Sequence, residues 1–502
     1  MGCTTILVGK NASYDGSTIV ARNEDSPTGI FNPKRVVIVH PEDQPRTYTS
    51  VLSHVTIDLP DDPMRYSAAP NALLDKGLWA QAGINSANVA MSATETLTSN
   101  ERVLGADPLV ELQPAQGTPG EDGYVPEVPG GIGEEDFVTL VLPYINSARE
   151  GVLRLGALLE QHGTYEMNGI AFSDVDEIWW LETVGGHHWI ARRVPDDVYV
   201  TMPNQLGIDE FDLDDALGEG RNFLASADLK TFIDDNFLDL SRGGNLNPRD
   251  AFGSHSDADH VYNTPRAWFI QKKLNPNSPD WQGADPRLKP DSDNLPWCRV
   301  PERKITIEDI KYLLSSHFQG TVYDPYSTVG TEEERSLFRP IGVNRHSQLA
   351  VLQIRPYRPE SSRAVQWMAY ASNPFNALVP LYTNVSKMPD YLSNTTGRVD
   401  TDSFYWASRL IAALADAHYF ETINVIDEYQ QAAQAAGHAM VKRTDALMAE
   451  ASAEDEQAVQ KVLEAGNEEI SQVVRTHTDA ALDSVLLISS NGMRNGFKRS
   501  VK

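Results

Sequence analysis

The chain has 502 residues, with 41% hydrophobic and 22% charged residues, a composition typical of a folded globular protein. Acidic residues outnumber basic ones by 70 to 42, and the net charge of −28 disfavours binding to nucleic acid or to anionic membranes. The two cysteines, Cys3 and Cys298, exclude a disulfide framework and favour a reducing compartment. Because the chain also has neither a secretory signal nor an apolar run of about 20 residues, we expect a cytoplasmic protein.

The first 25 residues have the pattern of a β-hairpin. Residues 4–9 and 17–22 are rich in β-forming side chains, and residues 11–16 between them are dense in turn formers. Chain ends normally fray. A strand that begins this close to the terminus would instead hold Cys3 on an ordered element.

The next hundred residues predict short strands, a long loop and helices. Strands are predicted at 35–40, 78–82 and 88–93, and helices within 134–161, with a break near Pro143 or within 147–151. The proline- and glycine-rich stretch 106–133 is predicted to be a loop. A loop this long in a compact domain usually serves as a lid or a binding loop.

The rest of the chain alternates short strands with helical segments. Four strands with very short connections form a predicted antiparallel meander at 169–173, 177–183, 188–193 and 198–202. An acidic, helical or irregular region, a capped helix, two strands and a long helical region follow at 209–260, 306–317, 348–355, 364–371 and 403–465. Together these elements predict an α+β fold with stacked layers.

Cys3 is the first candidate for chemistry, although a lone cysteine is more often a buried structural residue. If the chain began at Cys3, that residue would carry both a thiol and a free α-amine. The reference pKa of an α-amine is about 7.7–8.0, so a usable fraction is unprotonated near neutral pH. The amine can then accept the thiol proton, which makes Cys3 a candidate nucleophile with its own general base.

Arg22 and Asp25 lie at the end of the second predicted strand, where the hairpin brings them back beside Cys3. A guanidinium close to a thiol favours the thiolate and disfavours protonation of a nearby amine. A carboxylate at Asp25 can orient that amine. Taken alone, these two residues are more often a surface ion pair at a strand end.

Two segments together carry a family resemblance. Met-Gly-Cys-Thr-Thr-Ile at the start and Ala21-Arg-Asn-Glu-Asp-Ser26 resemble the cysteine N-terminal-nucleophile (Ntn) dipeptidases of lactic acid bacteria, of the dipeptidase A type. More distantly they resemble penicillin V acylases and bile salt hydrolases. The resemblance implies a four-layer αββα sandwich. We therefore expect a catalytic domain over 1–400, with 106–133 as a lid, and a helical C-terminal region over 401–502 packed on it.

The resemblance also implies further site residues. Ala82-Gly-Ile-Asn85 is similar to an acylase segment beside the nucleophile, which gives Asn85 a role in the oxyanion hole or in substrate orientation. Val200-Thr-Met-Pro-Asn204 is similar to a strand end whose Asn amide completes that hole. Thr264-Pro-Arg266 is similar to a segment that supplies a second active-site cation, Arg266. The implied catalytic set is Cys3, Arg22, Asp25, Asn85, Asn204 and Arg266.

One position departs from the acylase pattern, in which only Met precedes the cysteine. Here Gly2 would remain after removal of Met1 and would block the amine of Cys3. The mechanism therefore requires loss of Met1-Gly2, by autocatalysis or by another peptidase.

The predicted activity is hydrolysis of dipeptides with broad side-chain tolerance, through an acyl-enzyme on Cys3. The alternatives are an N-acyl amide hydrolase of the penicillin V acylase or bile salt hydrolase type, and a catalytically silent scaffold of the same fold. We expect no cofactor and no metal, because His187 and His188 are strand neighbours on opposite faces and no other metal-ligand spacing occurs. We expect a homo-oligomer that binds small peptides, and a structural role for Cys298.

Overall fold

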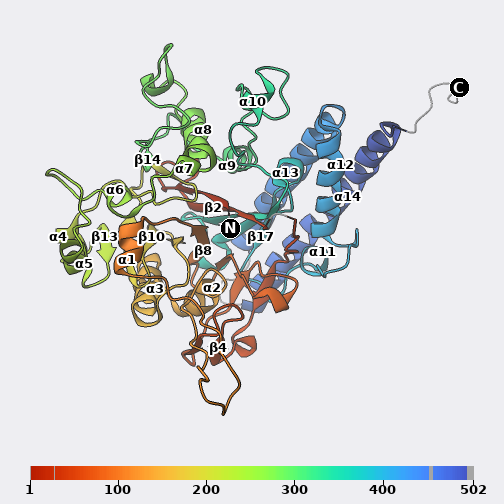
Figure 1. Cartoon of the computed structure of the whole chain (residues 1–502). Helices are drawn as coiled ribbons and strands as arrows, with labels where there is room; N and C mark the ends of the chain where they lie inside the picture. The colour runs from red at the N-terminus through yellow and green to blue at the C-terminus, as the bar shows by residue number, and fades with distance from the viewer. Residues whose placement is uncertain (1, 28, 451–455, 495–502) are drawn as a thin grey trace, which may run out of the picture.

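The computed structural model describes residues 2–27, 29–450 and 456–494, without the side chains of 93–95 and 450. In this part of the chain the strands form two large antiparallel sheets and two small ones (Figure 1). The seven-stranded sheet runs β14 (Cys298–Arg299), β12 (Tyr199–Met202), β1 (Cys3–Val8), β2 (Thr18–Asp25), β15 (His346–Ile354), β16 (Ala364–Tyr370) and β17 (Val379–Tyr382). The six-stranded sheet runs β13 (Phe223–Ala225), β11 (His188–Arg193), β10 (Ile178–Val184), β9 (Asn168–Ser173), β8 (Ala90–Thr96) and β7 (Ala82–Ile84).

The small sheets pair β3 (Val37–Val39) with β6 (Tyr66–Ala68), and β4 (Thr47–Thr49) with β5 (Thr56–Asp58). The helices are α1 (Glu101–Ala106), α2 (Phe137–Val141), α3 (Ala148–His162), α4 (Leu213–Ala216), α5 (Leu229–Asp235), α6 (Pro248–Phe252), α7 (Asp257–Tyr262), α8 (Thr264–Leu274), α9 (Ile307–Leu314), α10 (Glu332–Arg335), α11 (Asp390–Ser393), α12 (Phe404–Ala417), α13 (Tyr419–Glu450) and α14 (Glu456–Asn491). The combination of antiparallel sheets with separate helical segments confirms the α+β class.

The two large sheets pack face to face, with β1 and β2 against β8 and β9, and helices cover their other faces. Helix α3 lies on β9, β10 and β11, whereas α8 and α9 lie on β12, β1 and β2. Both faces of β10 are buried, because Trp180 belongs to the core between the sheets and its neighbour Trp179 to the core under α3. The long apolar runs of the central strands follow from this double burial.

The predicted N-terminal hairpin is confirmed, with β1 beginning at Cys3 itself. The helix predicted over 306–317 is also confirmed, since Thr306 and Asp309 form the expected capping box at the start of α9. The helical region predicted over 134–161 divides into α2 and α3, with Pro143 in the interruption.

The predicted meander differs from the structure in its fourth strand. Strands β9, β10 and β11 pair in sequence as expected. Strand β12 instead leaves the six-stranded sheet and pairs with β1, with Thr5 opposite Met202. Hydrophobic patterning cannot distinguish the two sheets, because both bury their strands on two faces.

The strand predicted over 78–82 is wrong, because β7 begins only at Ala82. Trp79 and Gln81 have φ values of 47° and 63°, a left-handed conformation that breaks an extended strand. The apolar composition of this segment reflects burial in a bent chain.

The predicted loop over 106–133 is confirmed as irregular, and it folds back on itself through bridges between Gln113 and Val128 and between Gln116 and Val125. Residues 117–123 at its tip are exposed, and the loop extends away from the body at the bottom of Figure 1. Its role as a lid stays a prediction.

The C-terminal helices α12, α13 and α14 lie together at one side of the molecule (Figure 1), and all three contact strands of the seven-stranded sheet or each other. Asn467 of α14 bonds both backbone groups of Tyr382 on the edge strand β17, at 2.8 Å and 2.9 Å. The division at residue 400 stays a prediction.

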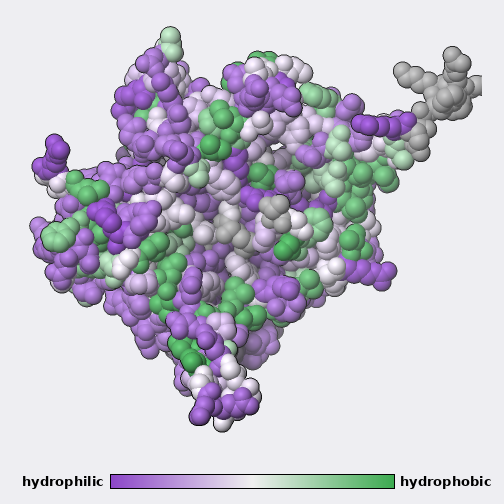
Figure 2. Space-filling model, in the orientation of Figure 1, coloured by the Kyte–Doolittle hydropathy of each residue, from purple (hydrophilic) through white to green (hydrophobic). Residues whose placement is uncertain are grey.

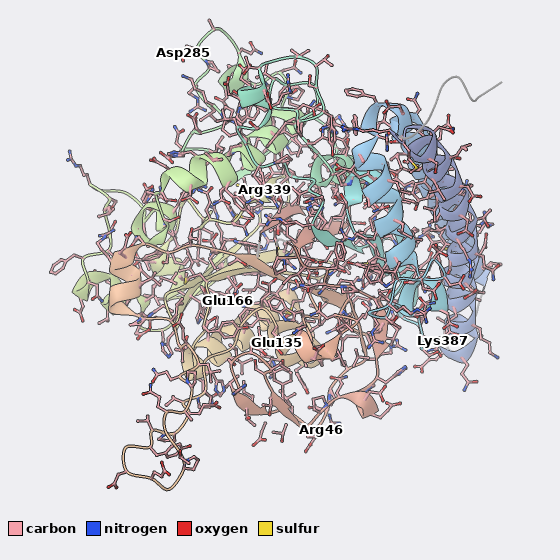
Figure 3. The ribbon with its side chains drawn as sticks, turned by 45° about the vertical axis from the view of Figure 1, so that its right-hand side comes forward. Arg46, Glu135, Glu166, Asp285, Arg339 and Lys387 are labelled. Carbon is pink, nitrogen blue, oxygen red and sulfur yellow. The ribbon has the colours of Figure 1, made fainter. Side chains whose placement is uncertain are left out.

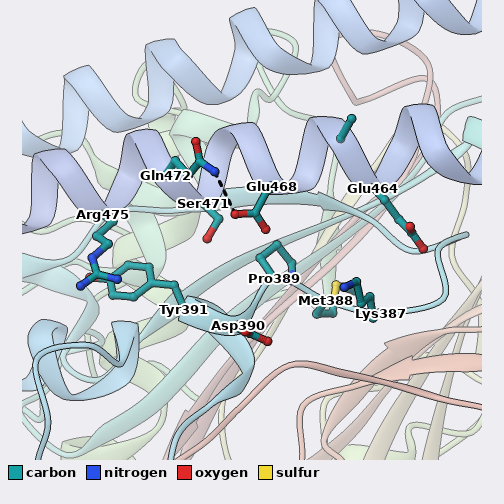
Figure 4. A pocket seen from close by; sticks show the side chains of 11 residues that line it. Lys387, Met388, Pro389, Asp390, Tyr391, Glu464, Glu468, Ser471, Gln472 and Arg475 are labelled. Atoms are coloured by element: carbon teal, nitrogen blue, oxygen red, sulfur yellow. Dashed lines mark hydrogen bonds between the residues drawn. The ribbon is translucent and has the colours of Figure 1, made fainter.

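Where α14 crosses the 387–391 segment, it leaves a hollow of about 500 Å³ that carries acidic and basic side chains (Figure 4). The face of the molecule seen in Figure 2 is mostly hydrophilic, with hydrophobic residues scattered over it. None of the helices in the described residues is both long and apolar enough to cross a membrane.

Candidate active site

Cys3 is held between two strands at the centre of the seven-stranded sheet. It lies opposite Glu24 of β2, while β12 pairs with β1 on the other side. Its side chain is fully buried. Cys3 thus begins a strand that is paired on both sides, which removes the fraying expected near a chain end.

Arg22 contacts the thiol directly, as its position in the hairpin predicts. Its Nη2 lies 2.9 Å from Cys3 Sγ and donates to Glu134 Oε1 at 2.8 Å. Its Nη1 donates to Gln81 Oε1, and Gln81 Nε2 donates to Glu134 Oε1 at 3.0 Å. All four side chains are buried, so the guanidinium acts on the sulfur with little screening by water and favours the thiolate.

Gln81 and Glu134 owe their positions to unusual local backbone. Gln81 is in the left-handed conformation that ended the predicted strand, a strain of about 1–3 kcal/mol that surrounding contacts must offset. Glu134 follows Gly133, where a Cβ would collide with the ring of Tyr165. The carboxylate of Glu134 uses Oε1 for Arg22 and Gln81, whereas its buried Oε2 has no hydrogen-bond partner among the described residues.

Asn204 and Arg266 surround the backbone of Cys3. Asn204 Oδ1 accepts a hydrogen bond from Cys3 N at 3.1 Å and another from Arg266 Nη2 at 2.7 Å. Arg266 Nη1 also donates to the carbonyl oxygen of Cys3 and to Thr4 Oγ1. Asn263 fixes both residues, since its Oδ1 accepts from Asn204 N at 3.1 Å and from Arg266 Nη2 at 2.7 Å. The structure thus brings Asn204 and Arg266 to the nucleophile candidate.

Asp25 lies one residue beyond the strand position that faces Cys3, in a group of basic side chains. Its carboxylate contacts Arg339, His346 Nε2 at 3.1 Å and Arg345 Nη2 at 3.6 Å. Burial by itself raises the pKa of Asp25, but these neighbours hold it well below its usual range. Asp25 is therefore a permanent carboxylate that arranges cations.

Asn85 occupies a turn between β7 and β8. Its Nδ2 donates to the carbonyls of Leu142 and Ile145 at 2.9 Å and 2.7 Å, and its Oδ1 accepts from Ala87 N and Val89 N. Both amide hydrogens are thus used by backbone groups. The contacts favour a turn-fixing role for Asn85 over a donor role toward substrate.

Gly2 packs against the same surroundings as Asp25. A Cβ at this position would collide with Tyr262 Oη and lie 2.9 Å from Asp25 Oδ2. A larger residue before Cys3 would therefore have to displace the side chain of Tyr262, so glycine suits this position. Met1, whose removal the mechanism requires, lies outside the described residues.

The other singled-out residues lie elsewhere. Cys298 is in the edge strand β14, where burial raises the pKa of its thiol to about 11 and keeps it protonated at neutral pH. His187 and His188 both contact Asp107 through Nδ1, at 2.9 Å and 2.7 Å. The expectation of opposite faces does not hold, because His187 precedes β11 and lies in the turn.

The residues that sequence reasoning missed come from distant segments: Gln81, Glu134, Tyr262, Asn263, Arg339 and His346. Gln81 directly precedes the Ala82-Gly-Ile-Asn85 segment, and Asn263 and Tyr262 directly precede Thr264-Pro-Arg266. Extending those two motifs by a few residues would have found them. Glu134, Arg339 and His346 have no comparable signal.

Comparison with known proteins shows the family of the chain. The model of peptidase family C69 matches residues 2–432. A dipeptidase of Bifidobacterium longum (strain NCC 2705) is 58% identical, over 100% of both chains. A probable dipeptidase A of Streptococcus pyogenes is 55% identical over 100% of both chains, and a probable dipeptidase B of Lactococcus lactis is 44% identical over 99% of this chain and 97% of its own.

These matches identify the protein as a peptidase, a hydrolase of peptide bonds. The chain belongs to peptidase family C69. The predicted resemblance to the dipeptidases of lactic acid bacteria is confirmed, since relatives with that name cover nearly the whole chain.

Proposed function

We propose that this peptidase hydrolyses dipeptides through Cys3, after loss of Met1-Gly2. The observation that carries the proposal is the surroundings of Cys3, whose sulfur lies against Arg22 and whose nitrogen lies against Asn204. The names of the relatives support the substrate class. The two facing sheets with helices on their outer faces support the αββα sandwich of the Ntn hydrolases.

In the first step the α-amine of Cys3 takes the thiol proton, and the sulfur attacks the peptide carbonyl. Asn204 Oδ1 accepts one N–H of the amine, which directs the nitrogen lone pair toward other positions, including the thiol. Arg266, bonded to the carbonyl of the same residue, disfavours protonation of the amine by like-charge repulsion. The amine thus remains a competent base.

The tetrahedral intermediate expels the amine of the second amino acid, and a thioester to the first remains on Cys3. Water, deprotonated by the same α-amine, then hydrolyses the thioester. The resemblance gives Asn204 the role of oxyanion donor. We assign Asn85 instead to positioning β7 and β8, because its amide hydrogens are used within the turn.

Processing can use the same atoms. The thiol of Cys3 attacks the carbonyl of Gly2, the Cys3 nitrogen leaves as the amine, and water hydrolyses the resulting thioester to release Met-Gly. The close fit of Gly2 against Tyr262 and Asp25 supports this route, because it holds the bond to be broken in one conformation.

The test compares Cys3→Ala with Cys298→Ala on a free dipeptide such as alanyl-alanine. We expect Cys3→Ala to abolish hydrolysis and Cys298→Ala to leave kcat/KM unchanged, because the Cys298 thiol is protonated and lies in an edge strand. Turnover by Cys3→Ala would remove the thiol from the mechanism.

A second comparison uses N-acetyl alanyl-alanine with the unaltered enzyme. The proposal expects the free dipeptide to be preferred. Preference for the blocked compound would favour the N-acyl amide hydrolase alternative, and cleavage of neither would favour the silent scaffold.

A further inference from the structure

We infer that Arg339 binds the free C-terminal carboxylate of the substrate, so that the enzyme selects peptides that end one residue beyond the cleaved bond. This inference rests on the proposed dipeptidase function and adds to it a specificity-determining residue. Arg339 lies in the segment between α10 and β15 and is labelled in Figure 3.

The hydrogen-bonding capacity of Arg339 is only partly used. Its Nη2 contacts Asp25, whereas its buried Nε and Nη1 have no hydrogen-bond partner in the described part of the chain. The side chain is only 9% exposed, so water does not satisfy those donors freely. A guanidinium presents its donors as a planar fork that matches a carboxylate, and a bound carboxylate would satisfy them.

The side chains around Arg339 are mostly basic. Asp25 is the carboxylate of this group, and it faces the guanidinium groups of both Arg339 and Arg345 as well as the imidazole of His346. The ring of Tyr262 lies 5.1 Å from Arg339 Cζ, in position for a cation–π contact. Both guanidinium groups therefore lie against the same buried carboxylate, and Arg345 Nη2 also donates to Tyr262 Oη at 2.7 Å.

A cavity of about 440 Å³ opens beside these guanidinium groups. Its walls are Arg339 and Arg345, residues 29–31 and residues 343–344. Ile30 and Phe31 expose apolar side chains there, and the arginines supply the charge. The combination suits an amino acid that presents a carboxylate and a side chain of variable character.

Gly2 connects the side chains around Arg339 to Cys3. That residue is directly bonded to Cys3 N, and a Cβ on it would meet both Tyr262 and Asp25, so Gly2 lies beside these two side chains. Asp25 in turn contacts Arg339. In a dipeptide the carboxylate follows the scissile carbonyl by a single residue, about 3.5 Å of chain. A carboxylate on Arg339 would therefore place the scissile bond of a dipeptide near Cys3, and a longer peptide would put an uncharged amide there.

The first test uses the unaltered enzyme and two substrates that differ in one group, alanyl-alanine and alanyl-alanine amide. We expect kcat/KM for the amide to be on the order of 100-fold lower, because the buried guanidinium loses its charged partner. Equal values for the acid and the amide would overturn the inference.

The second test repeats the comparison with Arg339→Met and Arg339→Lys. Arg339→Met should lower kcat/KM on the acid by on the order of 100-fold, mainly through KM, and should abolish the preference for acid over amide. Arg339→Lys keeps the charge without the fork and should give an intermediate preference. The matched control is Arg335→Met, which removes a partly exposed arginine that bonds the carbonyl of Gly330. It should leave kcat/KM unchanged for both substrates.

A structural role for Arg339 would give a different result. It would lower hydrolysis of the acid and the amide by the same factor and leave the preference intact, which would overturn the inference. If Arg339→Met does not fold, Arg339→Lys decides: an acid–amide preference equal to that of the unaltered enzyme would overturn the inference. Failure of the proposed function gives a different result from failure of this inference. Hydrolysis of alanyl-alanine by Cys3→Ala would contradict the proposed function, whatever preference between acid and amide is measured.

Discussion

At the residue scale, Arg22 is shared between a sulfur and a carboxylate. The same Nη2 lies 2.9 Å from Cys3 Sγ and 2.8 Å from Glu134 Oε1. Glu134 therefore fixes the position of the guanidinium. Its negative charge also weakens the electrostatic effect of Arg22 on the thiol. Gln81 is hydrogen-bonded to both Arg22 and Glu134, and its backbone is strained in this position.

Replacing Arg22 by Met should make the thiol of Cys3 less reactive, because a nearby positive charge favours the thiolate. The rate of alkylation of Cys3 by iodoacetamide near pH 7 should fall on the order of tenfold, and its pH dependence should move to higher pH. Mass spectrometry of the labelled N-terminal peptide measures the rate.

The control for that experiment is Arg193→Met, which removes a surface guanidinium paired with Glu177 and Asp196. It should leave the alkylation rate unchanged. Equal rates for Arg22→Met and the unaltered protein would show that Arg22 does not act on the thiol.

At the element scale, the site depends on strand pairings of very different range. The β1–β2 hairpin is local, and the sequence predicts it together with the placement of Arg22 and Asp25 near Cys3. The contact of Cys3 with Asn204 spans 201 residues, and it exists because β12 crosses to the other sheet. No local pattern in the sequence specifies that crossing, so only the family resemblance pointed to Asn204.

Glu134 and Arg339 show the same limit. Glu134 begins a segment that the sequence predicts as helical but lies in the turn before α2, and Arg339 lies in an irregular segment before β15. Each reaches the site through tertiary packing. A single acidic or basic residue in a loop is usually solvated, so residue type and spacing give no reason to select these two. Neighbours of a recognised motif, such as Asn263 beside Arg266, are the residues that sequence reasoning can recover.

The contact between α14 and β17 gives a prediction at this scale. Asn467→Ala would leave the N–H and C=O of Tyr382 without partners at a buried sheet edge. We expect the free energy of unfolding to fall by about 2 kcal/mol, while kcat/KM stays unchanged. Urea denaturation measures the loss.

The matched control is Gln472→Ala on the exposed side of the same helix, where Gln472 bonds only Glu468 within the helix (Figure 4). Its effect should stay within about 0.5 kcal/mol. If Asn467→Ala is no more destabilising than Gln472→Ala, the amide does not anchor α14 to the sheet.

At the scale of the whole molecule, stability depends on buried carboxyl groups that prefer to be protonated. Burial raises the pKa of Glu182 to about 7, and the group lies in the core between the sheets and the 207–208 segment. Its reference pKa in an unfolded chain is about 4.3. Between these two pKa values the folded state holds a proton that the unfolded state has lost. The contribution of Glu182 to the free energy of unfolding is therefore fully present below about pH 4 and declines as the pH rises to 7.

Glu182→Gln should remove this contribution, because an amide does not titrate. Between pH 5 and pH 7 the unaltered protein should lose on the order of 2 kcal/mol of unfolding free energy relative to the variant. Urea denaturation of both proteins at the two pH values measures the difference. An identical difference at pH 5 and pH 7 would show that Glu182 does not titrate in this range.

The account as a whole depends on one event, the exposure of the α-amine of Cys3. The most direct test is the intact mass and the N-terminal residue of purified enzyme, measured alongside its rate on alanyl-alanine. We predict that the active molecules begin at Cys3 and that activity rises in proportion to their fraction. A preparation that retains Met1 or Gly2 throughout and is fully active would contradict the account.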